Sequence, residues 1–244
     1  MDDYSGGVLN KVTVKVVLPE ASPWGQVELR CLIDGQDVVE EVFDKGPGKD
    51  PDVLLGPRSP LLAVDGPGEV RLAEAVCTWA CCGAIDVRVR REDRVVIWDQ
   101  WSNPDVARVP LGEYRFDADQ YEAELTRAHR DRGWEWPGRT IARLVRTSLA
   151  DPAALERWNS SLDFVVSRPG SRGRVDVVFT SPPKHVLIEY YRLFGRVMEH
   201  SQFRQRTPVT DEPPIIQVQR ILATLRTEDP RANSEICGGY TGRS

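Results

Sequence analysis

The sequence predicts an α+β fold: a mostly antiparallel, sheet-rich region over residues 1–116, then a helical region with a second β hairpin over 117–244. β-branched and alternating runs fill the first region, which is typical of strands. After Asp117 the apolar residues recur at helical spacing. The chain has 244 residues, 41% of them hydrophobic, enough to bury a core as one large domain or two small ones. Whether the two regions form one continuous domain stays open.

Alternation places most strands of the first region. Val27–Ile33 alternates, and Asp34-Gly35 then predicts a hairpin turn, because glycine adopts positive φ without strain. The return strand is expected over Val38–Phe43. Further segments complete a sheet of about five or six strands. They are strands over Val12–Leu18, Glu69–Val76, Ala84–Arg90 and Val95–Trp98, with a short helix over Asp52–Leu55 inside the loop-rich segment 46–60.

Capping signals and helical spacing place the helices of the second region. Asp117 lies three residues before Gln120, a capping-box pattern, and predicts a helix to Arg130 with Tyr121 on its apolar stripe. Pro137 begins the next helix. The remaining expectations are a short helix over Asp151–Trp158, strands over Phe164–Ser167 and Val175–Thr180, a helix after Pro183 bearing Leu187, Tyr191, Phe194 and Met198, a loop over Thr207–Pro214, a helix from Pro214, and a tail that frays from Glu228.

Charge and composition argue against several protein classes. The net charge is −5 and the isoelectric point about 5.4, far from the strongly basic balance of a nucleic-acid-binding domain. No apolar run is long enough to span a bilayer, and the acidic N-terminus does not resemble a secretory signal. The chain has five cysteines, and an odd number cannot all pair in disulfides within one chain, which favours reduced thiols. We therefore expect a cytoplasmic protein with no membrane partner.

Cys77, Cys81 and Cys82 form the densest group of metal-ligating residue types. A structural zinc ion needs four ligands, usually as two close pairs, and the other cysteines and the histidines lie far away in the sequence. Small buried thiols at a strand end are the leading interpretation, and a zinc ion is the alternative. Phosphate-binding loops, HExxH and GxSxG are absent, so the sequence predicts no cofactor and identifies no catalytic residue.

Arginine and tryptophan supply the candidate partner-binding residues. Arg139, Arg143 and Arg146 recur at i, i+4 and i+7 opposite the apolar stripe of their helix, as either a solvated face or an anion-binding one. Trp101 and Trp134 either dock helices on the sheet or, where exposed, act as binding hot spots. Residues 127–206 carry 15 basic and 8 acidic side chains, so the basic surplus lies in this segment.

Several motifs between Cys77 and Trp136, with the residues that follow, are similar to those of a known group of sequences. They are Cys82-Gly83, Val96-Ile97-Trp98, the helical segment from Gln120 to Glu124, and Trp134–Arg139. This stretch, about a quarter of the chain, resembles uncharacterised actinobacterial proteins that have no assigned activity. The resemblance implies a bacterial origin and carries over no site residue.

The sequence favours a non-enzymatic interaction or regulatory protein of the bacterial cytoplasm, immunity-like or accessory to a partner protein. The abundance of Trp and Arg suits protein interfaces. Two alternatives stay open. One is an enzyme whose active site lies between the sheet and helical halves and uses His185, Asp163 or Asp176. The other is a nucleic-acid-binding protein that uses the arginines of 127–206.

Overall fold

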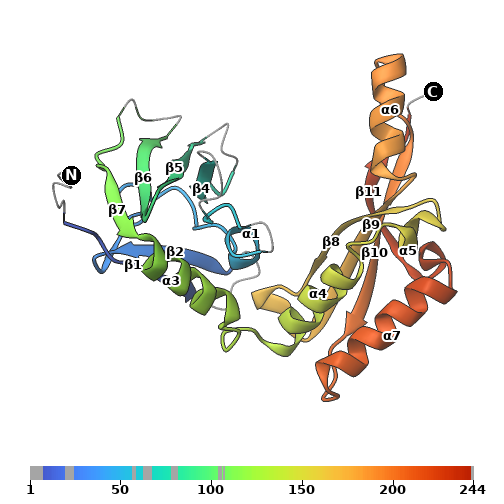
Figure 1. Cartoon of the computed structure of the whole chain (residues 1–244). Coiled ribbons are helices and arrows are strands. Elements are labelled where there is room, and N and C mark those ends of the chain that lie inside the picture. Colours follow the sequence, from blue (N-terminus) through green and yellow to red (C-terminus); the bar gives the residue numbers. More distant parts are fainter. Residues whose placement is uncertain are drawn as a thin grey trace. The chain divides into compact units, whose positions relative to one another are not determined.

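The computed structural model confirms the α+β class. It describes residues 8–19, 25–56, 59–62, 68–77, 82–103, 106 and 108–242, with helices and three antiparallel sheets (Figure 1). The chain divides into two compact units, residues 1–134 and 135–244. None of the helices in the described part of the chain combines the length and hydrophobicity needed to cross a membrane.

The first unit contains two sheets, where the sequence predicted one. Its elements are β1 (Val12–Val17), β2 (Glu28–Ile33), β3 (Gln36–Asp37), α1 (Pro51–Leu54), β4 (Gly68–Glu74), β5 (Ala84–Glu92), β6 (Val95–Ser102), β7 (Tyr114–Asp117) and α3 (Ala118–Arg130). The sheets have the orders β1-β2-β3 and β4-β5-β6-β7. The N–H of Asn10, just before β1, donates to the carbonyl of Arg115 in β7 at 2.7 Å. Both sheets therefore enclose one apolar core.

A loop segment joins the other edges of the two sheets. The N–H of Leu29 in β2 donates to the carbonyl of Lys49, and the N–H of Lys49 donates to the carbonyl of Leu72 in β4, both at 2.8 Å. Gly46 precedes this contact and lies so close to β4 that an added Cβ would be 2.0 Å from the carbonyl oxygen of Glu74. The absence of a side chain at position 46 therefore lets the segment lie between the sheets.

The Asp34-Gly35 turn is confirmed, but the strand expected over Val38–Phe43 is wrong. Asp34 and Gly35 have φ of 52° and 88°, and β2 pairs with the two-residue β3. The Asp37 carboxylate then accepts hydrogen bonds from the backbone N–H groups of Val39 and Glu40, at 3.0 and 3.1 Å. This cap starts a helical turn, because it satisfies N–H groups that a strand would pair with a neighbour. The turn buries the apolar side chains of the segment, including Phe43.

Helix α3 has the predicted cap and stripe. The Asp117 carboxylate accepts from the N–H of Gln120 at 2.9 Å, and Tyr121, Leu125 and Ala128 are buried. The stripe packs on the core of the first unit. The boundary between the compact units therefore follows Trp134 instead of separating the strands from the helices at residue 116.

The polar side of α3 completes the outer edge of β1. Gln120 Nε2 donates to the Val12 carbonyl at 3.2 Å, Glu124 Oε1 accepts from the Val14 N–H at 2.7 Å, and Arg127 Nη2 donates to the Val14 carbonyl at 2.8 Å. Arg127 lowers the pKa of Glu124, and the Val14 N–H adds to this shift. These side chains satisfy backbone groups that a bare edge strand would offer to another chain.

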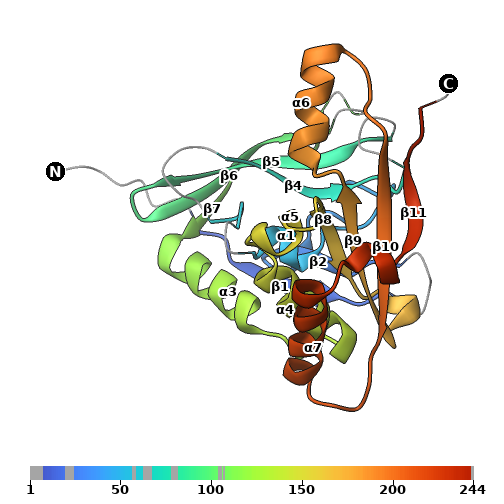
Figure 2. The ribbon, with the colours of Figure 1, turned by 90° about the vertical axis from the view of Figure 1, so that its right-hand side faces the viewer.

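The second unit is a four-stranded sheet with helices packed against it (Figure 2). Its elements are α4 (Pro137–Ser148), α5 (Ala153–Glu156), β8 (Ser161–Val166), β9 (Arg174–Ser181), α6 (Lys184–Phe194), β10 (His200–Pro208), α7 (Pro214–Thr227) and β11 (Glu235–Tyr240). The sheet order is β11-β10-β9-β8. Side chains of α4 and α7 form a core with one face of β9, including Val145, Phe179 and Leu225.

Two expectations in the second unit are wrong, and one strand is missed. The helix after Pro183 ends at Phe194, because Gly195 adopts φ of 64° and closes the helix with a hydrogen bond to Tyr191, so Met198 lies outside it. Strand β10 was not predicted. The tail does not fray from Glu228, because β11 pairs with β10.

Candidate functional site

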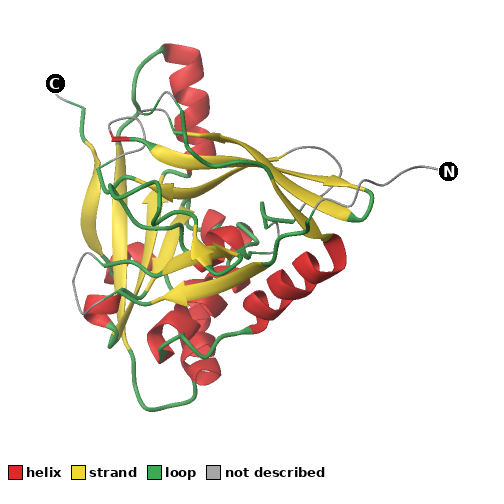
Figure 3. Cartoon of the chain, turned by 90° about the vertical axis from the view of Figure 1, so that its left-hand side faces the viewer, coloured by secondary structure: helices red, strands yellow, loops and turns green. Residues whose placement is uncertain are grey.

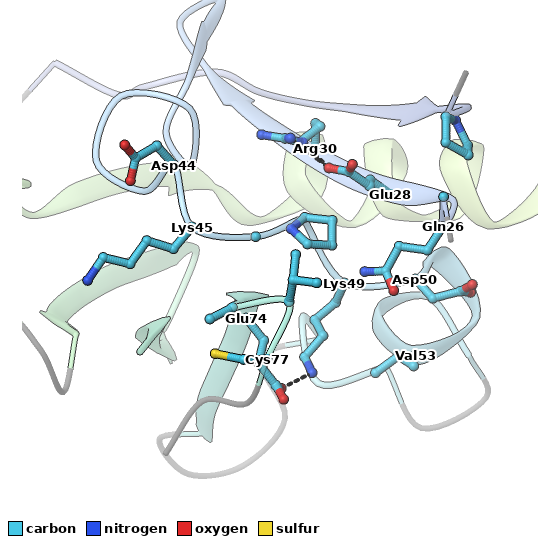
Figure 4. Close-up of a pocket in the computed structure, with 16 residues that line it drawn as sticks. Gln26, Glu28, Arg30, Asp44, Lys45, Lys49, Asp50, Val53, Glu74 and Cys77 are labelled. Carbon is cyan, nitrogen blue, oxygen red and sulfur yellow. Dashed lines mark hydrogen bonds and ion pairs between the residues drawn. The ribbon is translucent and has the colours of Figure 1, made fainter. Parts of the chain in front are cut away.

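A cavity of about 870 Å³ lies in the first unit, beside the segment that joins its two sheets. Figure 4 shows charged side chains around it, from β2, from the segment 44–50 and from β4. The volume falls within the range of small-molecule pockets, about 300–1,000 Å³. By size alone, the cavity is a candidate ligand site.

The charged groups of this cavity are largely paired within its wall. Arg30 Nη2 lies 2.6 Å from Glu28 Oε2, which also accepts from the Gly48 N–H at 2.9 Å. Lys49 forms an ion pair with Glu74. A ligand would have to displace these pairs before it could use their charge. The wall therefore points to no particular ligand chemistry.

The candidate zinc ligands fall only partly within the structure. Cys77 is exposed on the wall of the cavity, Cys82 is half-buried, and Cys81 lies outside the described residues. Among the residues that the structure describes, no three His, Cys, Asp or Glu side chains are grouped to hold a metal ion. The leading interpretation, small buried thiols, is wrong for Cys77, which is exposed. Zinc binding at Cys77, Cys81 and Cys82 stays an untested alternative.

The cysteines should differ sharply in reactivity. Cys31 is buried, and burial raises the pKa of its thiol to about 12, whereas Cys77 is exposed. Because the thiolate is the reactive form, N-ethylmaleimide at neutral pH should label Cys77 in the folded chain and leave Cys31 unlabelled. Mass spectrometry of the labelled peptides measures this difference. In urea both should be labelled, and labelling of Cys31 in the folded chain would contradict its burial.

The three candidate arginines lie on α4, in different surroundings. Arg143 forms a two-point ion pair with Glu135, with Nε 2.7 Å from Oε1 and Nη2 3.0 Å from Oε2. Arg139 is buried and Arg146 is half-buried. Of the three arginines, Arg143 therefore pairs with Glu135, a carboxylate of the same unit.

Both candidate tryptophans are half-buried in the first unit. Trp101 Nε1 donates to the Gly112 carbonyl at 2.8 Å, and its ring packs against Trp98 and Tyr114. Trp134 Nε1 donates to the Asp131 carbonyl at 2.9 Å. Their indole N–H groups are therefore already satisfied, and only part of each ring is open to a partner.

The three residues of the enzyme alternative do not contact one another. Asp163 lies on β8 with 4% of its side chain exposed, and Lys184, Thr180 and Gln202 contact its carboxylate at 2.7–2.8 Å. Asp176 is buried on β9, and His185 is exposed on α6. No hydrogen bond or ion pair joins Asp163, Asp176 and His185, so the structure does not assemble this catalytic group.

Helix α6 brings together several exposed large apolar side chains of the second unit. It projects beyond the end of β9, and the chain then returns to β10 (Figures 1 and 3). We call residues 184–199 the arm. Not one residue of α6 is buried, and four of its large apolar side chains are more than half exposed. These are Ile188 (52%), Tyr191 (57%), Leu193 (69%) and Phe194 (58%), followed by Val197 (50%).

The arm could have been recognised from its sequence. Val186, Leu187, Ile188, Tyr190, Tyr191, Leu193 and Phe194 make seven of the eleven residues of α6 apolar. A helix that is apolar on most sides is normally buried against another surface. Large exposed apolar patches are more frequent at interaction sites than elsewhere on protein surfaces.

The comparisons with known proteins return no relative. No protein-family model matches the chain, and neither a curated protein nor a solved structure matches it.

Proposed function

We propose that the chain is a non-enzymatic interaction protein of the bacterial cytoplasm that binds a partner protein through the arm and thereby regulates or assists that partner. The observation that carries this proposal is the exposure of α6, none of whose apolar side chains belongs to either hydrophobic core. Burying an exposed apolar side chain releases about 25 cal/mol for each Å² removed from water. A partner that covers the arm gains this energy.

The composition of the arm suits a protein partner. Tyr and Phe supply large, rigid contact area at low conformational cost, and aromatic residues are enriched in the centres of protein interfaces. The rings of Tyr190 and Phe194 lie 4.7 Å apart, and Gly195 fixes the end of the helix. The half-buried Tyr190 ring therefore holds the exposed Phe194 ring in a defined arrangement, as a binding surface requires.

Paired substitution on the arm tests the proposed function. The variant Leu193→Ser with Phe194→Ser should lose partner binding at least roughly tenfold, because two exposed anchors are removed. The matched control is Ile215→Ser with Ile216→Ser on α7, where the two residues are 53% and 42% exposed and lie outside the arm. The measurement is quantitative co-purification of cytoplasmic proteins from the native host with each variant. Proteins retained equally by the wild type and the arm variant would overturn the proposal.

A further inference from the structure

We infer that the partner on the arm is a second copy of this chain, bound by antiparallel pairing of two α6 helices. This inference rests on the proposed function and names its partner. Within the second unit, Val186, Leu187 and Tyr190 are half-buried, and they define the side of α6 that faces its own chain. The opposite side is available to another molecule.

That outward side has a defined composition. Successive residues of a helix are about 100° apart, so Ile188, Arg192, Glu189 and Leu193 follow one another around an arc of about 140°. All four are exposed. The outward arc therefore has one acidic and one basic residue at its centre and an apolar residue at each border.

The two central charges have no partner within the described chain. Neither Glu189 nor Arg192 forms an ion pair or a side-chain hydrogen bond with any residue that the structure describes, although they are three residues apart. Exposed charges of opposite sign beside apolar residues are typical of surfaces that select and orient a partner.

A second copy satisfies both charges at once. Two α6 helices can pair antiparallel about a two-fold axis that crosses each helix at the level between Tyr190 and Tyr191. In this arrangement Glu189 of each copy lies opposite Arg192 of the other. The same surface then serves on both chains, as in any two-fold symmetric interface. An axis through Glu189 or through Arg192 would instead oppose like charges, which is unfavourable. The charges thus favour one register, in which Ile188 and Leu193 border the pairs on either side.

The small size of α6 limits the expected affinity of the dimer. Helix α6 has eleven residues and is about 16 Å long. A specific interface of standard size buries about 800 Å² on each partner, more than one face of such a helix supplies. The dimer should therefore be reversible, with a dissociation constant in the micromolar range.

Charge reversal tests this pairing directly. Sedimentation velocity of the full chain from roughly 1 to 200 µM should show a monomer–dimer equilibrium for the wild type. Glu189→Arg alone and Arg192→Glu alone should each weaken the dimer at least roughly tenfold. Each substitution places like charges opposite one another at both symmetry-related contacts of the dimer. The variant with both substitutions should return to within roughly threefold of the wild type, since the pairs are restored with reversed sign.

Mixing separates pairing between chains from an effect within one helix. A one-to-one mixture of the Glu189→Arg chain and the Arg192→Glu chain should form a heterodimer, because each faces the opposite charge on the other. An attraction within one helix would give no such heterodimer. Circular dichroism checks that each variant keeps its helix.

The outcomes distinguish this inference from the proposed function. A wild type that stays monomeric throughout, or a dimer that neither charge reversal weakens, overturns the inference. If a monomeric chain still captures another protein in an arm-dependent way, the proposed function stands without it. If the chain neither dimerises through α6 nor captures another protein through the arm, the inference and the proposed function are both wrong.

Discussion

Replacing Trp98 by alanine should destabilise the first unit by about 3–5 kcal/mol, the usual cost of deleting a fully buried tryptophan. Trp98 lies on β6 with none of its surface exposed. The rings of Phe116 and Tyr121 meet it edge to face, with centroids 5.6 and 6.2 Å away. Its Nε1 donates to Tyr121 Oη at 3.1 Å, and this hydroxyl donates to the Leu61 carbonyl at 2.8 Å. The substitution therefore leaves a large cavity and removes one link of a buried hydrogen-bond chain.

Hydrogen exchange read by mass spectrometry measures this loss for the first unit alone. Peptides from β5, β6 and α3 should exchange much faster in Trp98→Ala, while peptides from β9 and α7 should change little. Trp134→Ala is the matched control, because Trp134 is half-buried and lies outside the apolar core. Equal loss of protection in the two variants would show that Trp98 does not hold the core together.

Local signals explain the parts of the fold that the sequence predicts well. The helix after Asp117 needs only its cap and its apolar stripe, and the Asp34-Gly35 turn needs only two residues that tolerate positive φ. The strand expected over Val38–Phe43 is wrong for an equally local reason. Asp37 caps the following turn, and β propensity does not outweigh that cap.

Elements defined by distant partners could not be predicted. β10 is largely polar and lacks alternation, and it forms because β9 and β11 pair with its two sides. β11 contains Gly238-Gly239 and is exposed along most of its length, so its own residues carry little strand signal. Its place in the sheet depends on β10, which lies more than twenty residues earlier in the chain.

The candidate sites likewise combine features that local sequence predicts with features that depend on distant parts of the chain. The spacing of Arg139, Arg143 and Arg146 predicts a shared helix face, but burial decides whether such a face meets solvent. Glu135 precedes α4 and reaches Arg143, a contact that helical spacing alone does not reveal. For α6 the sequence predicts the helix, while its exposure depends on the rest of the second unit, in which α4 and α7 cover the core of the sheet.

Replacing Arg143 by alanine should destabilise the second unit by about 3–5 kcal/mol, because it removes a two-point ion pair from a buried carboxylate. The Glu135 side chain is only 1% exposed, and Arg143 approaches both of its oxygens. Thr140 Oγ1 donates to Oε2 at 3.0 Å and would remain as a neutral contact. Arg143→Lys should be intermediate, since lysine keeps the charge and loses the two-point geometry.

A double variant identifies the buried charge as the cause. Arg143→Ala together with Glu135→Gln should recover much of the stability lost in Arg143→Ala, because the buried carboxylate charge that Arg143 faced is removed as well. The control is Arg220→Ala, which removes an ion pair with Glu212 that is exposed on both sides and should cost much less. Urea unfolding followed by hydrogen exchange in α4 and β8 measures all these variants. If Arg143→Ala costs no more than Arg220→Ala, or if the double variant is less stable than Arg143→Ala, the Glu135 carboxylate does not depend on Arg143 for its burial.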